Sequence, residues 1–143
     1  MKQIIEAIKQ RLATVPSINY SDSNWGQLDY YEDQPPVKFP CVLIDFDSID
    51  YTDVARGSQE GFATVNITVA SLKLSNTSSR APVQQREDGE RIWDILEDVH
   101  ISVQNWKPTT QAGSMIRRTA RKNRRDDGVL SYTVTYALQV YGV

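Results

Sequence analysis

Four acidic residues, Asp45, Asp47, Asp50 and Asp53, are the first group in this chain whose type and spacing could perform chemistry. Paired carboxylates can act as acid and base, and clustered carboxylate oxygens hold divalent cations. A cation loop needs ligands that converge from a tight turn with a glycine, whereas IDFDSIDYTD has the alternation of an extended strand. The pattern therefore favours a solvated acidic strand edge, then a partner-facing acidic patch, and a metal site least of all.

A basic cluster forms the second group, near the end of the chain. Its members are Arg117, Arg118, Arg121, Lys122, Arg124 and Arg125, six of the sixteen Lys and Arg residues. Arginine forks match phosphate oxygens, and clustered cations release counterions from nucleic acid, so residues 117–125 could form a basic hairpin that binds nucleic acid. No aromatic side chains interleave with these arginines to stack on bases, which weakens that interpretation.

The acidic and basic groups have opposite signs and belong to different predicted strands. Two interpretations are equally favoured. In one, the acidic edge of one subunit meets the basic hairpin of the next, which sets orientation and register in a head-to-tail contact. In the other, the two groups form an ion-pair network within one chain.

A third candidate is a nucleophilic cysteine. Cys41 is the single cysteine, so it forms no internal disulfide, and it begins the strand-like run CVLIDF, where a small core side chain is expected. A nucleophile would need an activating histidine, and His100 is the one histidine present. The sequence contains no Gly-rich phosphate loop, paired Cys or His ligands, or Ser-His-Asp arrangement. We therefore expect no catalytic residue, metal or cofactor, and a protein that binds and assembles.

The elements that position these residues follow from the apolar periodicity. Spacings of three and four predict helices over residues 2–14 and about 83–105. Alternation predicts strands over residues 41–51, 62–72, 114–122 and 129–141, and a short irregular strand around Trp25, Leu28 and Tyr30. The first long strand is expected to be buried on both faces at one end. We expect an α+β fold: a mostly antiparallel sheet of four to five strands with two helices packed on one face, in the order α-β-β-β-α-β-β.

Connections and helix surfaces complete this prediction. The polar segment 52–61 contains the turn formers Gly57 and Ser58, and residues 74–81 form a polar loop that we expect to be mobile. Trp93 and Ile101 lie off the apolar stripe of the second helix, which indicates either a wider core or a subunit contact.

The length of 143 residues fits a single domain, residues 1–143, with one core. The longest apolar runs are far shorter than the roughly 20 residues of a membrane-spanning helix. The N-terminal MKQIIEAIKQRL alternates charged and apolar residues, unlike a secretory signal. We expect no membrane contact.

Five segments together resemble the tail terminator and tail-completion proteins of tailed bacteriophages, which also include neck or head-tail joining proteins. They are MKQIIEAIKQRLATVP, VKFPCVLIDF, FATVNITVASL, GERIWDILEDVH and GVLSYTVTYALQVYGV. The resemblance covers nearly the whole chain in order and size, through layout and not through a strict motif.

This resemblance implies a virion structural protein without catalytic residues, assembled in the bacterial host's cytoplasm. Such a subunit forms a homo-oligomeric ring, typically of six copies, that caps the tail tube or joins it to the head. Its partners would be tail tube and head-tail connector proteins, with DNA passing through the channel without specific binding. Residues 52–61, 74–81 and 121–128 would contact partners, and Arg56 and Arg80 lie in the first two of these segments. A nucleic-acid-binding module using residues 117–125 remains the alternative, and a small enzyme using Cys41 and His100 the third hypothesis.

Overall fold

The computed structural model describes residues 1–72, 78–84 and 90–142. Its elements, in chain order, are α1 (Lys2–Ala13), β1 (Tyr20–Ser23), β2 (Cys41–Ala55), β3 (Ser58–Leu72), α3 (Arg91–Val103), β4 (Ile116–Asn123) and β5 (Val129–Tyr141). The predicted α+β fold and the order α-β-β-β-α-β-β are confirmed.

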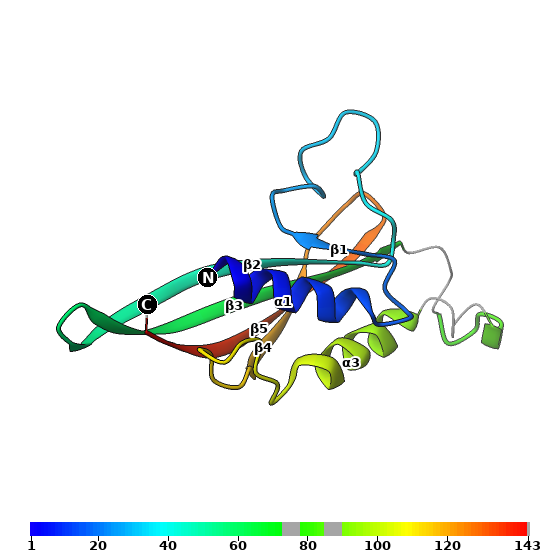
Figure 1. Ribbon diagram of the computed structural model, residues 1–143. Helices are drawn as coiled ribbons and strands as arrows, with labels where there is room; N and C mark the ends of the chain where they lie inside the picture. Colours follow the sequence, from blue (N-terminus) through cyan, green and yellow to red (C-terminus); the bar gives the residue numbers. More distant parts are fainter. Residues whose placement is uncertain (73–77, 85–89, 143) are drawn as a thin grey trace.

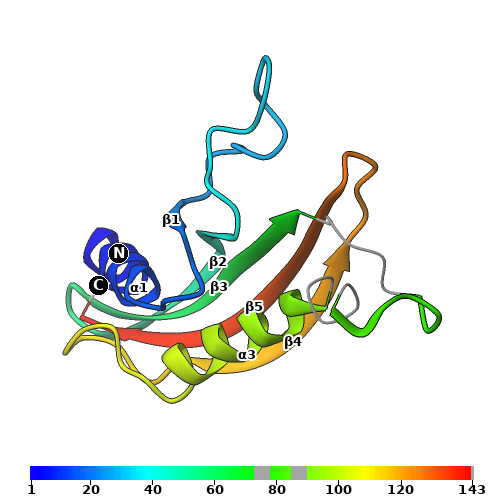
Figure 2. The ribbon, with the colours of Figure 1, turned by 90° about the vertical axis from the view of Figure 1, so that its right-hand side faces the viewer.

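The five strands form one sheet in the order β1-β2-β3-β5-β4. β1 pairs parallel with β2, and the other three pairings are antiparallel. The long strands curve (Figure 2), and because β3 and β5 pair antiparallel, the β2–β3 turn and the β4–β5 turn lie at opposite ends of the sheet. Both turns are therefore accessible from outside the domain.

Both helices pack on the same face of the sheet, which we call the helix face (Figure 1). α1 buries Ile4, Ile8 and Leu12, one residue per turn, and ends before Pro16, which has no N–H for a further turn. α3 buries a matching stripe, Ile92, Ile95, Val99 and Val103. Each of these aliphatic side chains contributes about 1.5–3 kcal/mol by leaving water. The amphipathic stripes read from the sequence therefore fix both helices to the sheet. None of the described helices is long and apolar enough to cross a membrane.

A second, smaller core lies on the opposite face of the sheet. Cys41 and Leu43 alternate with the helix-face residues of β2, and the long β1–β2 connection covers them with Leu28 and Phe39. This connection projects away from the sheet in both views (Figures 1 and 2). The prediction that this strand is buried on both faces at one end is confirmed.

The short strand predicted around Trp25, Leu28 and Tyr30 is in the wrong place. The strand is Tyr20–Ser23, and the chain then turns at Gly26, which has φ +96° and accepts a hydrogen bond from the Tyr30 amide at 2.9 Å. Leu28 packs into the second core from this turn, so its apolar side chain marks a core contact and not a position in a strand.

The polar segment 52–61 also differs from expectation. It is not a long connection but the end of a paired hairpin, with Thr52 opposite Glu60 and Ala55 opposite Ser58. The turn itself is confined to Arg56 and Gly57, and Gly57 has φ +70°, a conformation that glycine adopts without strain. Backbone pairing extends these strands past the core, where apolar alternation no longer marks them.

The remaining boundaries differ less. The helix predicted over about 83–105 is present as Arg91–Val103, and residues 85–89 lie outside the described residues. It ends at Val103 because Gln104 is extended and Asn105 has φ 60°. The loop predicted over 74–81 also lies partly outside the described residues, since these exclude 73–77.

Candidate assembly surface on two sheet edges

The four aspartates lie on the part of β2 that extends past β1. Asp45 is half-buried, whereas Asp47, Asp50 and Asp53 are exposed. Burial, and next the neighbouring charge of Asp47, raise the pKa of the Asp45 carboxyl above its ordinary value. The charged form of Asp45 is therefore destabilised in the isolated chain.

A β-bulge at Asp47 determines which faces these carboxylates occupy. The register shifts between Phe46 and Ser48, so Asp47 has no paired residue on β3. Phe46 and Ile49 both pack against the helix-face core, which a regular strand could not achieve at an odd spacing. Because of the bulge, Asp50, which pairs with Phe62, lies on the same face as Asp45, the face of the sheet away from the helices.

The basic residues occupy β4, the strand at the other edge of the sheet. Arg117, Arg118, Arg121 and Lys122 are all exposed there. Arg121 is paired with Thr133 on the opposite face, and Lys122 with Tyr132 on the helix face. The cations therefore extend from both faces of the edge strand and form no single basic surface.

β3 and β5 separate the acidic strand from the basic strand, which places them about 14 Å apart at three strand spacings. The ion pairs between described residues include those of Lys9 with Glu6 and Asp22, and of Arg125 with Asp29 and Asp127. None of these joins β2 to β4, so the intrachain network considered from the sequence does not form between the two strands.

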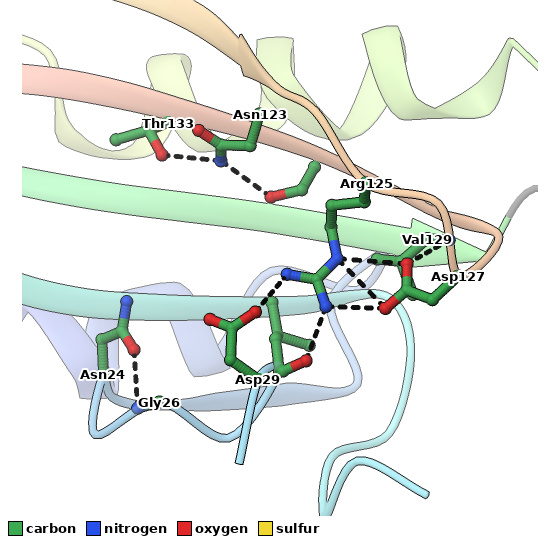
Figure 3. A network of polar contacts seen from close by, with 10 residues as sticks. Asn24, Gly26, Asp29, Asn123, Arg125, Asp127, Val129 and Thr133 are labelled. Carbon is green, nitrogen blue, oxygen red and sulfur yellow. Dashed lines mark hydrogen bonds and ion pairs between the residues drawn. The ribbon is translucent and has the colours of Figure 1, made fainter. Parts of the chain in front are cut away.

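Arg125 has an intramolecular role (Figure 3). Its Nη1 donates to Asp29 Oδ1 at 2.8 Å, and its Nη2 donates to the Leu28 carbonyl at 2.5 Å and to Asp127 Oδ2 at 2.6 Å. Hydrogen bonding to Arg125 lowers the pKa of the Asp127 carboxyl. Arg125 thus fastens the β1–β2 connection to the β4–β5 turn, while its neighbour Arg124 is exposed.

The cysteine and histidine of the third hypothesis are not brought together. Cys41 is fully buried in the core of the opposite face, and burial raises the pKa of its thiol to about 12. His100 belongs to α3 on the helix face, where its Nδ1 is 3.3 Å from the Tyr136 hydroxyl. The sheet lies between them, and a thiol of that pKa remains protonated at neutral pH.

The opposite face beyond the second core carries polar side chains that satisfy one another. Thr68 and Thr133 hydroxyls are 3.3 Å apart, and Thr135 donates to Asn66 at 2.9 Å. A depression of about 400 Å³ at its far end is lined by residues that include Asp50 and Arg118. Within the described ranges, no three His, Cys, Asp or Glu side chains gather as a metal site would require.

The other predicted contact residues are exposed but scattered. Arg56 lies in the β2–β3 turn, and Arg80 in a turn closed by a 2.9 Å hydrogen bond from the Ala81 amide to the Ser78 carbonyl. Trp93 and Ile101 are 56% and 69% exposed, so the described chain provides no wider core around them. Sequence reasoning missed Tyr51, Val54 and Phe62, apolar side chains exposed on the β2–β3 hairpin. Because their neighbours in the sequence are mostly polar, no apolar pattern identified them.

The comparisons with known proteins give a likeness in fold. No protein-family model matches the sequence, and no curated protein matches it. A solved structure described as the virion of a native gene transfer agent (GTA) particle contains a chain with TM-score 0.56 and 10% sequence identity. The match covers 96% of this chain and 94% of that chain. At this identity the likeness shows a shared fold over nearly the full length of both chains.

Proposed function

We propose that this protein is a structural component of a phage-like virion. The carrying observation is the full-length fold likeness to a chain of a gene transfer agent virion, in which 96% of this chain is covered. Because 94% of that chain is covered as well, the shared unit is the whole subunit and not an embedded motif. The sequence resemblance to tail terminator and neck proteins supports the same class from the order and size of the elements.

Within that class, the role we propose is a ring-forming subunit that closes the tail tube or joins tail to head. The two edges of the sheet support a ring, since they carry opposite charges on different surfaces of one subunit. Contacts between two different surfaces of identical subunits generate closed rings when the rotation between neighbours closes. We propose six copies, neighbouring tail tube and connector proteins, DNA that passes without specific binding, and assembly in the host bacterial cytoplasm.

We further propose that the role is not catalytic. Cys41 and His100 lie on opposite faces of the sheet, and the thiol is fully buried. The acidic residues extend along a strand and across both of its faces, so their carboxylates do not converge on one point. Binding and geometry then account for the function.

Binding of nucleic acid by residues 117–125 is the rival function. A groove that tracks a phosphate backbone needs its cations on one surface. Here Arg121 and Lys122 lie on opposite faces of β4, and Arg125 is held by two carboxylates. This distribution supports a role in strand-edge contacts more than a role in phosphate binding.

The test is the solution mass by light scattering over a concentration series, at low and moderate salt, with and without duplex DNA. We expect a discrete multimer without DNA, near six times the 16.2 kDa subunit mass. A monomer that associates only when DNA is added would replace this proposal with the rival function. If the protein is monomeric with and without DNA, electron microscopy of purified particles decides, and the absence of ring density for this protein would reject the proposal.

A further inference from the structure

The sheet has two open edges. β1 pairs with only four residues of β2, Cys41 to Ile44, and the last contact on that side is from the Asn24 amide to the Ile44 carbonyl at 2.8 Å. In the described part of the chain, no strand pairs with residues 45–55 on the side away from β3, and we call this side the acidic edge. An unpaired edge presents a row of free N–H and C=O groups that can accept another strand.

The basic edge is the outer side of β4, Ile116–Asn123. β4 pairs with β5 alone, and its outer side is closed only at the start, where the Arg117 amide donates to Gln104 Oε1 at 2.9 Å. Residues 118–123 remain open within the described structure. Natural sheets protect such edges with charge, and charge of one sign on each edge repels a copy of the same edge.

The signs of the two edges select one kind of contact. Two acidic edges repel each other, and so do two basic edges, which disfavours a symmetric pairing of like strands. An acidic edge and a basic edge attract, and the match holds on each face of the sheet. Asp50 and Arg121 lie on the opposite face, whereas Asp53 and Lys122 lie on the helix face.

Strand direction is also compatible with this contact. β2, β3, β5 and β4 are neighbours in the sheet and alternate in direction. A second copy rotated about an axis along the strands presents its β2 antiparallel to β4 of the first copy. The alternation then continues from one subunit to the next without a break.

We propose that β4 of one copy pairs antiparallel with the acidic edge of the next copy, joining the sheets of neighbouring subunits edge to edge. This inference rests on the ring-forming function proposed above and names its interface. The half-buried Asp45 gains an arginine or lysine partner in that contact, which relieves the unfavourable charge that it carries alone. The exposed Tyr51 and Val54 of the same edge lose water contact on assembly.

Charge reversal tests the proposal. Variant A carries Asp50→Lys and Asp53→Lys, so cations face Arg121 and Lys122 across the contact. Variant B carries Arg121→Glu and Lys122→Glu, so carboxylates face Asp50 and Asp53. We expect each variant alone to associate at least tenfold more weakly than the wild type, because like charges then meet at these positions. An equimolar mixture of A and B should assemble, since the substituted edge of A can pair with the substituted edge of B, and the unsubstituted edges can pair with each other.

Two further variants separate charge pairing from loss of folding and from bulk charge. The chain with all four substitutions has the charges at these four facing positions exchanged and should assemble by itself. The matched control, Glu32→Lys with Asp33→Lys, has the same change in net charge as variant A at exposed positions outside the sheet edges, and should assemble like the wild type. Assembly of A and B that equals that of the wild type would overturn the edge pairing and leave the ring itself intact.

Cross-linking of purified particles tests the proposal if the wild-type protein assembles only on its tail. A zero-length carbodiimide joins a lysine amine to a carboxylate in direct contact. Within one copy three strand spacings, about 14 Å, separate Lys122 from the acidic edge, so a peptide joining Lys122 to Asp45, Asp47, Asp50 or Asp53 must link two copies. We expect that peptide and no joining of the exposed Lys107 to the same carboxylates. Rings without the Lys122 link would overturn the edge pairing, whereas particles without any ring of this protein would overturn the proposed function.

Discussion

Arg125 and Asp29 form a 2.8 Å ion pair across 96 residues of the chain, between the β4–β5 turn and the connection that follows β1 (Figure 3). The arginine side chain is only 14% exposed. The same guanidinium also binds Asp127 and the Leu28 carbonyl. This single side chain therefore fixes the position of Leu28 over the second core.

The first prediction concerns this contact. Replacing Arg125 with Ala should lower the free energy of unfolding by about 2 kcal/mol, because several charge-assisted hydrogen bonds are lost. Arg125→Lys should restore only part of the loss, since an ammonium cannot reproduce the guanidinium fork. Urea denaturation measures both. The control is Arg124→Ala at the exposed neighbouring position, which should change stability by less than about 0.5 kcal/mol. Equal effects of the two alanine variants would contradict the assigned role of Arg125.

The second prediction concerns the reactivity of Cys41. Burial raises the pKa of its thiol to about 12, so at pH 8 almost none of it is the nucleophilic thiolate. We expect no reaction with a thiol reagent in the native protein and one equivalent after denaturation. Labelling of the folded protein within minutes would show that the thiol is accessible and would return it to consideration as a nucleophile.

The third prediction concerns pH. Burial, and next the charge of Arg117, lower the pKa of His100 below its ordinary value. Below the ordinary pKa of about 6.5 the unfolded chain therefore binds more protons than the folded chain, so the contribution of His100 to stability falls as pH decreases from 7.5 to 5.5.

Comparison of two proteins isolates this contribution, because His100 is the sole histidine of the chain. Denaturation at both pH values should show a larger loss of stability on acidification in the wild type than in His100→Gln. The same pH dependence in both proteins would show that His100 titrates alike in the folded and unfolded states.

The fourth prediction concerns the β-bulge. Deleting Asp47 removes an unpaired residue and leaves Phe46 and Ile49 on the helix face, so the fold should survive with a loss of at most about 1 kcal/mol. Deleting Asp45 instead shifts Phe46 to the opposite face and places a carboxylate against the core. We expect that deletion to cost about 3 kcal/mol or more. Circular dichroism and urea denaturation of the two deletions make the comparison, and the reverse order of stability would contradict the assigned bulge.

How much the sequence could predict depends on how locally each feature is specified. β5 was predicted over its observed bounds because its apolar residues alternate without interruption along one face. The paired part of residues 52–61 could not be predicted in this way, since neither face of that hairpin end packs on a core. Its pairing depends on a partner strand and a two-residue turn, neither of which leaves an apolar pattern.

The candidate assembly surface divides in the same way. Its residues were identifiable because the four aspartates form one cluster in the sequence and the six cations form another. That Arg125 belongs to an intramolecular contact could not be predicted, because its partner Asp29 is 96 residues away and no local spacing connects them.

The sequence by itself determined the class of fold, the two helix stripes and the sign of the charge on each strand, because these depend on residues a few positions apart. Only the tertiary structure decided that β2 and β4 are at separate edges, that Cys41 and His100 are on opposite faces, and that a bulge rotates the aspartates. These relationships arise when distant segments pair through backbone hydrogen bonds. Such bonds use the same N–H and C=O groups in every residue except proline, so the local side-chain pattern does not reveal their partners.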